Sequence, residues 1–258
     1  MISPRLKEFV RAMSLEGMAL PSAPPSGGDA KVSADFSIED VAGCYRISGM
    51  EYRNGICQID ISKALLPAGT QEEHAQGRKQ ALANNDFYTP DFPLFHGVIN
   101  ALYQNREGPF KNQIESARAS LSDLMNGKWL MTLTRIRYAP TGQDSVIHNY
   151  GQDDQYEAAI GFVGPDGVIT KQETNAAPAL QALLSTQQSP QEIDQVYKWL
   201  RNKNAYLWRV NNRPKNNDER VARFFADSDG ASFDCYWVPQ GSGAAFGVRV
   251  RAAGAPKI

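Results

Sequence analysis

Residues 231–251 read ASFDCYWVPQGSGAAFGVRVR, and this stretch decides the fold that we expect. Apolar and polar side chains alternate over 233–237 and again over 246–251. A period of two indicates strands with one buried and one exposed face, and the glycine-rich segment 241–243 predicts a loop between them. We expect four side chains on the inward phases of this stretch and of the strand before it to be buried: Trp208, Phe233, Phe246 and Val248.

The chain upstream of this stretch mixes helices and strands. Thr70 opens one helix with Glu73 completing a capping box, and Ser189 opens another with Pro190 at its first position. Further helices are expected over 94–103 and 109–125. The expected strands are 42–48, 55–62, 128–138, 145–150, 157–163 and 206–210. This mixture predicts an α+β fold.

Two parts of unequal size are expected. Residues 1–20 carry five charged side chains and predict a short amphipathic helix rather than a secretory signal. Residues 21–35 are rich in Pro, Ser and Gly and predict a loosely draped arm. The first part is therefore 1–35, and 36–258 forms one domain.

No apolar stretch reaches the roughly 18 residues of a membrane span, so we expect no span and synthesis in the cytoplasm.

The net charge limits the classes of partner that we expect. The chain has 27 Lys and Arg against 28 Asp and Glu, a net charge of −1 that favours neither nucleic acid nor an anionic membrane.

Cys44, Cys57 and Cys235 form no CxxC pair and are expected to be reduced and buried. A disulfide between Cys44 and Cys57, across the first hairpin, stays open as an alternative.

Catalytic and cofactor signals are weak. His148 could be a general base, although local hydrogen bonding at a strand end is the favoured interpretation. The run Asp218-Glu219-Arg220 could form an acid–base pair in a cleft, although the start of a helix is favoured. The segment 241–247, GSGAAFG, is followed by too few residues for a dinucleotide-binding unit. We expect no cofactor.

A metal is not expected either. The histidines lack metal-ligand spacing. The segment 225–236 fails both end positions of an EF-hand loop, because Phe225 and Tyr236 occupy them. An improvised calcium site at Asp227, Asp229 and Asp234 is the alternative to a solvated acidic turn.

Three segments near the end of the chain carry a resemblance: YLWRVNNRP (206–214), DERVARFFADSDGASFDCYWVPQ (218–240) and AFGVRV (245–250). They resemble the C-terminal region of variable proteins of diversity-generating retroelements. Upstream, NREGPF (105–110) and HNYGQDDQY (148–156) are similar to archaeal members of that group. The resemblance is diffuse over 40–204 and clearer over 205–251. It implies a C-type-lectin-like fold with helical insertions, whose last strand is AFGVRV.

The resemblance also implies a function, which is to bind a ligand or receptor through a diversified face, without catalysis. The calcium motifs EPN, QPD and WND of animal lectins are absent. The expected ligand-binding residues are Asn211, Arg223, Phe225, Gly230, Ser232, Tyr236, Trp237, Val238, Gly241, Ser242 and Gly243. The partner is an unidentified protein or surface ligand.

Alternatives to this function remain open. One is an enzyme on the related formylglycine-generating fold, which a second thiol near Cys235 would favour. Another is a virion or structural interaction protein. Tyr236 and Trp237 could also be ordinary core residues, because a regular strand would turn one of them inward. If 236 and 241–243 form the binding face, their replacement should leave stability nearly unchanged, unless a glycine needs a positive φ.

Overall fold

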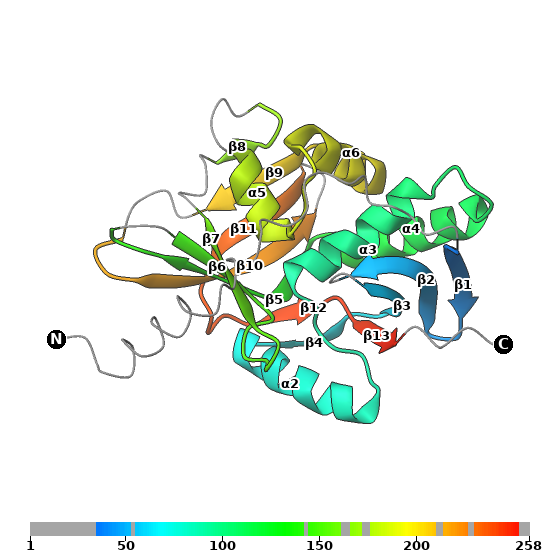
Figure 1. Ribbon diagram of the computed structural model, residues 1–258, viewed down its shortest axis with the longest axis horizontal. Coiled ribbons are helices and arrows are strands. Elements are labelled where there is room, and N and C mark those ends of the chain that lie inside the picture. Colours follow the sequence, from blue (N-terminus) through cyan, green and yellow to red (C-terminus); the bar gives the residue numbers. More distant parts are fainter. Residues whose placement is uncertain are drawn as a thin grey trace, which may run out of the picture.

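The structure is a computed structural model that describes residues 35–52, 55–141, 144–160, 166–171, 176–209, 214–226 and 230–252 (Figure 1). The expected N-terminal helix and nearly all of the arm lie outside these residues, as does Asn211. The described part is a mixture of helices and sheets, which confirms the α+β expectation. None of its helices is both long enough and apolar enough to span a membrane.

Two sheets organise the domain. The four-stranded sheet has the order β1 (Ser37–Val41), β2 (Cys44–Tyr52), β3 (Gly55–Ser62) and β13 (Val248–Ala252). The larger sheet has the order β4 (Leu66–Gly69), β12 (Gly243–Ala245), β5 (Lys128–Tyr138), β10 (Asp218–Ala226), β11 (Ala231–Trp237), β9 (Ala205–Arg209) and β8 (Gly167–Val168). At one end, β6 (Asp144–His148) pairs with β5, and β7 (Tyr156–Ile160) pairs with β6.

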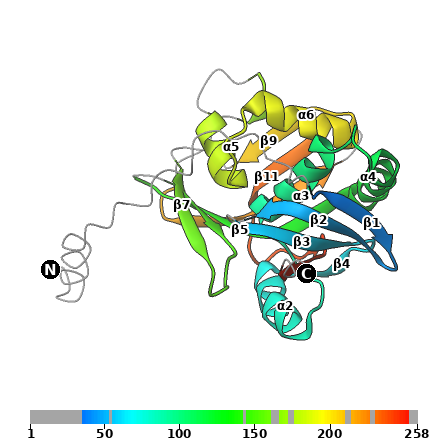
Figure 2. The ribbon, with the colours of Figure 1, turned by 45° about the vertical axis from the view of Figure 1, so that its right-hand side comes forward.

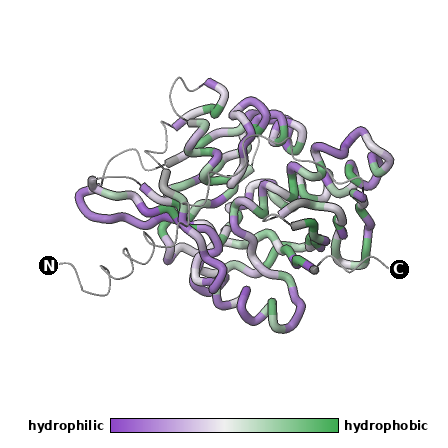
Figure 3. Tube along the Cα trace, viewed as in Figure 1, coloured by the Kyte–Doolittle hydropathy of each residue, from purple (hydrophilic) through white to green (hydrophobic). Residues whose placement is uncertain are grey.

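The five helices of the described chain are α2 (Gln71–Asn84), α3 (Phe92–Gln104), α4 (Lys111–Met125), α5 (Ala176–Leu184) and α6 (Pro190–Arg201). Both expected capping boxes are present, at Thr70–Glu73 and at Ser189–Glu192. Figure 2 shows α5 and α6 above β9 and β11, with α2 on the opposite side of the molecule. Hydrophobic stretches follow the central strands and α3, while hydrophilic ones lie in the outer loops (Figure 3).

The C-terminal stretch connects the two sheets. Phe246 and Gly247 join β12 of the larger sheet to β13 of the smaller one. The Phe246 side chain is buried, and its ring lies 5.6 Å from that of Phe95 in α3. A Cβ atom added at Gly247 would come within 3.0 Å of the Ser62 Cβ atom, so glycine permits this close approach. The last strand therefore returns to the hairpin formed by β2 and β3.

Several sequence expectations fail for identifiable reasons. Trp208 is 42% exposed, because Ala205 and Leu207 occupy the inward phase of β9. Asp218 begins a strand rather than a helix, since it pairs with Tyr138 of β5. The strands β1 and β4 and helix α5 were not expected from the sequence. Phe233, Phe246 and Val248 are buried as expected.

His96 predicts how stability depends on pH. Its ring is buried in α3, accepts a hydrogen bond at Nδ1 from the Tyr197 hydroxyl (3.2 Å) and donates from Nε2 to Gln188 (2.8 Å). Burial lowers its pKa to about 4, against about 6.5 in an unfolded chain. The unfolded state therefore binds the proton first, and His96 should destabilise the fold progressively as pH falls from about 6.5 to 4.

The measurement is urea unfolding of the wild type and of His96→Gln at pH 7, 6, 5 and 4. Gln keeps an N–H donor and does not titrate. We expect the wild type to lose more of its unfolding free energy than the variant over this range. Equal losses in the two proteins would contradict a neutral, buried His96.

Candidate ligand-binding site

The larger sheet turns an aromatic surface away from the main core. The strand register places Tyr206 of β9 opposite Ser232 of β11, which lies opposite Phe225 of β10. In the next row Trp208, Asp234 and Arg223 are opposite one another. Directly opposed residues share a face of a sheet. With Trp129 and Trp237, which pack on this side, they form what we call the aromatic face: Trp129, Tyr206, Trp208, Phe225 and Trp237.

A β-bulge places Tyr236 and Trp237. Arg223 pairs with Asp234, but Val221 pairs with Trp237, so three steps on β11 match two on β10. The extra residue lets both aromatic side chains avoid the main core. Tyr236 is 50% exposed, and Trp237 is half-buried against a small cluster of Met131, Val221 and Ala245. The strand is therefore not regular, and neither side chain belongs to the main core, although Trp237 packs against the small cluster.

Stacked side chains hold the aromatic face together. The rings of Trp129 and Phe225 are 3.9 Å apart and nearly parallel. The Arg223 guanidinium lies 4.5 Å from the Trp129 ring and 3.5 Å from the Trp237 ring. Cation–π contacts of this kind gain strength when the cation is desolvated. The side chains are thus fixed on strands rather than carried by a loop.

Arg223 and Asp234 form an ion pair beneath these rings. The Nη2 atom of Arg223 lies 2.7 Å from Oδ2 of Asp234, and the two side chains are 2% and 0% exposed. Burial lowers the pKa of Arg223 and raises that of Asp234, because loss of hydration outweighs their mutual attraction. The pair positions the tryptophans and is itself withdrawn from solvent.

The segment from Val238 to Ser242 closes over Trp237. The Gly241 amide donates to the Val238 carbonyl oxygen at 2.9 Å, forming a turn. The indole N–H of Trp237 is buried and has no acceptor among the described residues. At Gly241 an added Cβ atom would overlap the Nε1 atom of this indole. Glycine is therefore required at position 241 because the Trp237 indole leaves no room for a Cβ atom, and not because the backbone has a positive φ.

This contact predicts different tolerance at neighbouring positions. Gly241→Ala should displace the Trp237 ring and cost about 1–3 kcal/mol of unfolding free energy, as overpacking does. Ser242→Ala, at an exposed position, should change it by no more than about 0.5 kcal/mol. Urea unfolding followed by tryptophan fluorescence measures both variants. Equal stability of the two would show that the turn is free to move off the indole.

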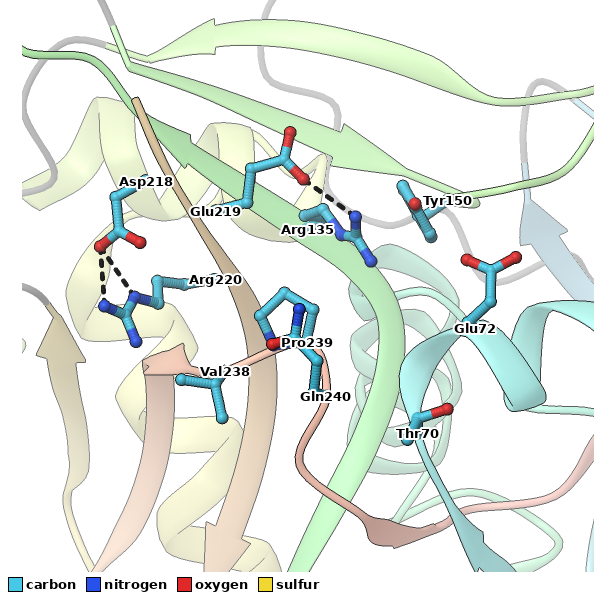
Figure 4. A pocket seen from close by; sticks show the side chains of 10 residues that line it. All are labelled: Thr70, Glu72, Arg135, Tyr150, Asp218, Glu219, Arg220, Val238, Pro239 and Gln240. Atoms are coloured by element: carbon cyan, nitrogen blue, oxygen red, sulfur yellow. Dashed lines mark hydrogen bonds and ion pairs between the residues drawn. The ribbon is translucent and has the colours of Figure 1, made fainter. Parts of the chain in front are cut away.

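Beside this turn lies a pocket of about 550 Å³. Figure 4 shows its lining: Thr70, Glu72, Arg135, Tyr150, Asp218, Glu219, Arg220, Val238, Pro239 and Gln240. Arg135 donates to Gln71 and to Glu219, at 2.8 and 2.9 Å, and its guanidinium lies 3.3 Å from the Tyr150 ring. The pocket therefore has a fixed, charged wall. Of these residues, the sequence indicated only Val238 as a binding residue; for Asp218 to Arg220 a cleft was the alternative to the favoured helix start, and α2 and β5 were not indicated.

The expected binding residues divide into four groups. Tyr236, Val238 and Ser242 are exposed, and Phe225, Trp237 and Gly241 are partly buried. Asn211 lies outside the described residues. Four positions are buried and do not belong to the accessible surface, which corrects the sequence expectation: Arg223, Gly230, Ser232 and Gly243. Trp129 lies outside the region 205–251 that the sequence indicated, whereas Tyr206 and Trp208 lie inside it but were not among the expected binding residues.

Histidines near the site have structural partners. His74 donates from Nε2 to the Gly243 carbonyl at 2.9 Å and accepts from Thr89 at Nδ1, which ties α2 to β12. His148 ends β6 as expected, but its hydrogen bonds are not local, because its ring bonds Thr134 of β5 and the Ala182 carbonyl of α5. Among the described residues no group of His, Cys, Asp and Glu could hold a metal ion. Asp227 and Asp229 lie outside those residues, and Asp234 is paired with Arg223.

The cysteines bear on the enzyme alternative. All three cysteines of the sequence are described, and each is buried and free, so the Cys44–Cys57 disulfide is not formed. Burial raises the pKa of the Cys235 thiol, which disfavours the reactive thiolate. Cys235 forms no disulfide with either of the other two cysteines. Comparisons with family models, curated proteins and solved structures find no match for this chain.

Proposed function

We propose that this chain is a ligand- or receptor-binding protein with a diversified surface on a rigid C-type-lectin-like scaffold, and that it performs no chemical step. One observation carries the proposal, the concentration of exposed aromatic side chains on one sheet. Of the six large hydrophobic side chains exposed in the described chain, four lie on or directly after β5, β9 and β11: Trp129, Trp208, Tyr236 and Val238. Exposed apolar patches mark interaction sites, and rigid aromatic anchors are typical of paratopes.

The scaffold beneath supports this function. The main core reaches β10 and β11 through Phe224 and Phe233, whose rings contact Tyr197 of α6. The side chains that point into the main core therefore anchor β10 and β11. The side chains on the opposite face of these strands contribute little to the main core. Such a division lets the surface change without unfolding the protein. The return of β13 to the first hairpin fits the invariant last strand that the resemblance implies.

Sequencing many copies of the gene from one population tests the proposal. We expect amino-acid changes to concentrate at Trp208, Tyr236, Val238 and Ser242. Ile56 and Leu82 are the matched controls, since they are 48% and 54% exposed but lie away from this surface. Ordinary drift at exposed positions would change both sets alike. Diversification predicts more amino-acid changes at Trp208, Tyr236, Val238 and Ser242 than at the two controls. It also predicts a near-identical repeat of the 3′ end of the gene beside a reverse transcriptase gene.

A further inference from the structure

Three arginines surround one buried carboxylate on the outer face of the smaller sheet. Arg46 of β2, Asp60 of β3 and Arg249 of β13 are directly opposed, so they share a face of that sheet. The next row of the register carries apolar core residues, so the row of Asp60 faces away from the core. Arg251, two residues farther along β13, adds the third guanidinium. We call Arg46, Arg249 and Arg251 the arginine cluster.

All three guanidinium groups contact Asp60. The Nε atom of Arg46 lies 2.8 Å from Oδ1 of Asp60. Arg249 Nη2 and Arg251 Nε lie 2.6 and 3.0 Å from Oδ2. The Asp60 side chain is 0% exposed, and desolvation by itself would raise its pKa. The pKa is nevertheless lowered, because the arginine cluster stabilises the charged carboxylate.

The charges of this group do not balance. A single guanidinium is enough to pair with both oxygens of a carboxylate, yet Asp60 has three. A second carboxylate, Glu39, lies opposite Arg46 on β1, but it is exposed and forms no ion pair within the described chain. Counting both carboxylates still leaves an excess of one positive charge. Like charges held this close repel one another, so a further anion here would be stabilising.

Donors for such an anion are available. Arg249 uses all three of its nitrogens, since Nη1 donates to the Asn85 carbonyl at 3.0 Å and the other two donate to Asp60. Nη1 of Arg46 and both Nη atoms of Arg251 have no acceptor among the described residues. These two side chains are 25% and 34% exposed, so a ligand can reach them while Asp60 restricts their movement.

The spacing of the two free donor groups suits a small anion. Arg46 and Arg251 bind the same carboxylate, so their guanidinium groups are no farther apart than the two neighbours of a single carboxylate. A phosphate group is of similar size and can therefore reach both. Its oxygens form a tetrahedron, so it can accept from two guanidinium groups at once, and Arg presents the paired donors that phosphate prefers.

We propose that the outer face of β3 and β13 binds a phosphate group through Nη1 of Arg46 and the Nη atoms of Arg251, with Asp60 holding both guanidinium groups in position. This site is on the smaller sheet, whereas the aromatic face is on the larger one. The inference therefore goes beyond the proposed function, and either can fail without the other. A free phosphate ion and a phosphate monoester share this chemistry.

Titration of the ¹⁵N-labelled full chain with inorganic phosphate tests the assignment. The pH is one at which the dianion predominates, and NaCl keeps the ionic strength constant. We expect saturable shifts at the backbone amides of Arg46, Gln58 and Arg251. Acetate at the same ionic strength should bind at least about fivefold more weakly, because it has one charge and a planar pair of oxygens. Shifts that do not saturate, or equal affinity for acetate, would overturn the proposal.

Methyl phosphate distinguishes the two sources of the group. An affinity equal to that of inorganic phosphate supports a site for a monoester on a larger ligand. A much weaker affinity supports a site for the free ion, because the methyl group then blocks one of the contacts. Local amide shifts also separate binding from the general stabilisation that phosphate salts give to folded proteins.

Variants locate the binding. Arg251→Gln leaves Asp60 with two arginine partners and should weaken phosphate binding by at least about fivefold. Arg118→Gln is the matched control, because the Arg118 side chain is also 34% exposed but is paired with Glu115 on α4. It should leave the phosphate affinity unchanged. An arginine cluster that only connects the strands would lose stability in Arg251→Gln with no change in phosphate affinity, and that result would contradict the site.

Discussion

Phe246→Ala should lower the free energy of unfolding by about 3–5 kcal/mol, the usual cost of removing a buried phenylalanine ring. Phe246 is 1% exposed and lies at the only link between β12 and β13, with its ring against Phe95 of α3. Its loss would leave a cavity between the two sheets and α3. Urea unfolding of the wild type and the variant measures the difference.

Trp208→Ala is the matched control for this prediction. It also removes a large aromatic side chain from the C-terminal region, but one that is 42% exposed. We expect a loss well below that of Phe246→Ala, because little of the Trp208 surface is removed from water. If Phe246→Ala costs less than about 1 kcal/mol, the core does not extend through this link as described.

Asp234→Ala should be about as destabilising, at about 3–5 kcal/mol, because it leaves the Arg223 guanidinium buried without its partner. Burial lowers the pKa of Arg223 and raises that of Asp234, so the ion pair does not fully offset its own desolvation. Replacing both charges with apolar side chains of similar size, Arg223→Met with Asp234→Leu, should therefore recover most of the lost stability.

The test compares thermal and urea unfolding of the single and double variants. If the double variant recovers the lost stability, the Arg223–Asp234 ion pair positions Trp129 and Trp237 but does not stabilise the fold. Near-ultraviolet circular dichroism reports on the same tryptophans, and we expect their signal to change in the double variant despite its stability. A double variant as unstable as the single one would contradict the desolvation argument.

Local patterns in the sequence were sufficient for much of the framework. The capping boxes at Thr70 and Ser189, the long strand 128–138 and the helix near 109–125 all appear close to the expected bounds. These features depend on interactions within a few residues, so short-range periodicity and turn chemistry specify them. The burial of Phe233, Phe246 and Val248 was also expected, although burial does not alternate around them: residues 231–235 and 245–248 are all buried, and Phe246 lies in the link between β12 and β13.

The candidate site was harder to locate from the sequence. The expected surface included Arg223, Ser232 and Gly243, all of which are buried, and it omitted Trp129 and Trp208. The side chain of Trp129 belongs to β5, nearly one hundred residues before Phe225, and only strand pairing brings the two rings to 3.9 Å. The pocket likewise combines α2, β5, β10 and the turn after β11, which no local motif connects.

By itself, the sequence determined the local helices and strands and the mixed α+β character of the fold. Backbone hydrogen bonding and side-chain alternation act over short sequence separations, so local patterns specify these features. Only the tertiary structure decided which face of β9 is buried and where Tyr236 and Trp237 point. The reason is physical: a single bulge opposite Val221 and Arg223 shifts the phase of β11, and a one-residue shift exchanges the two faces of a strand.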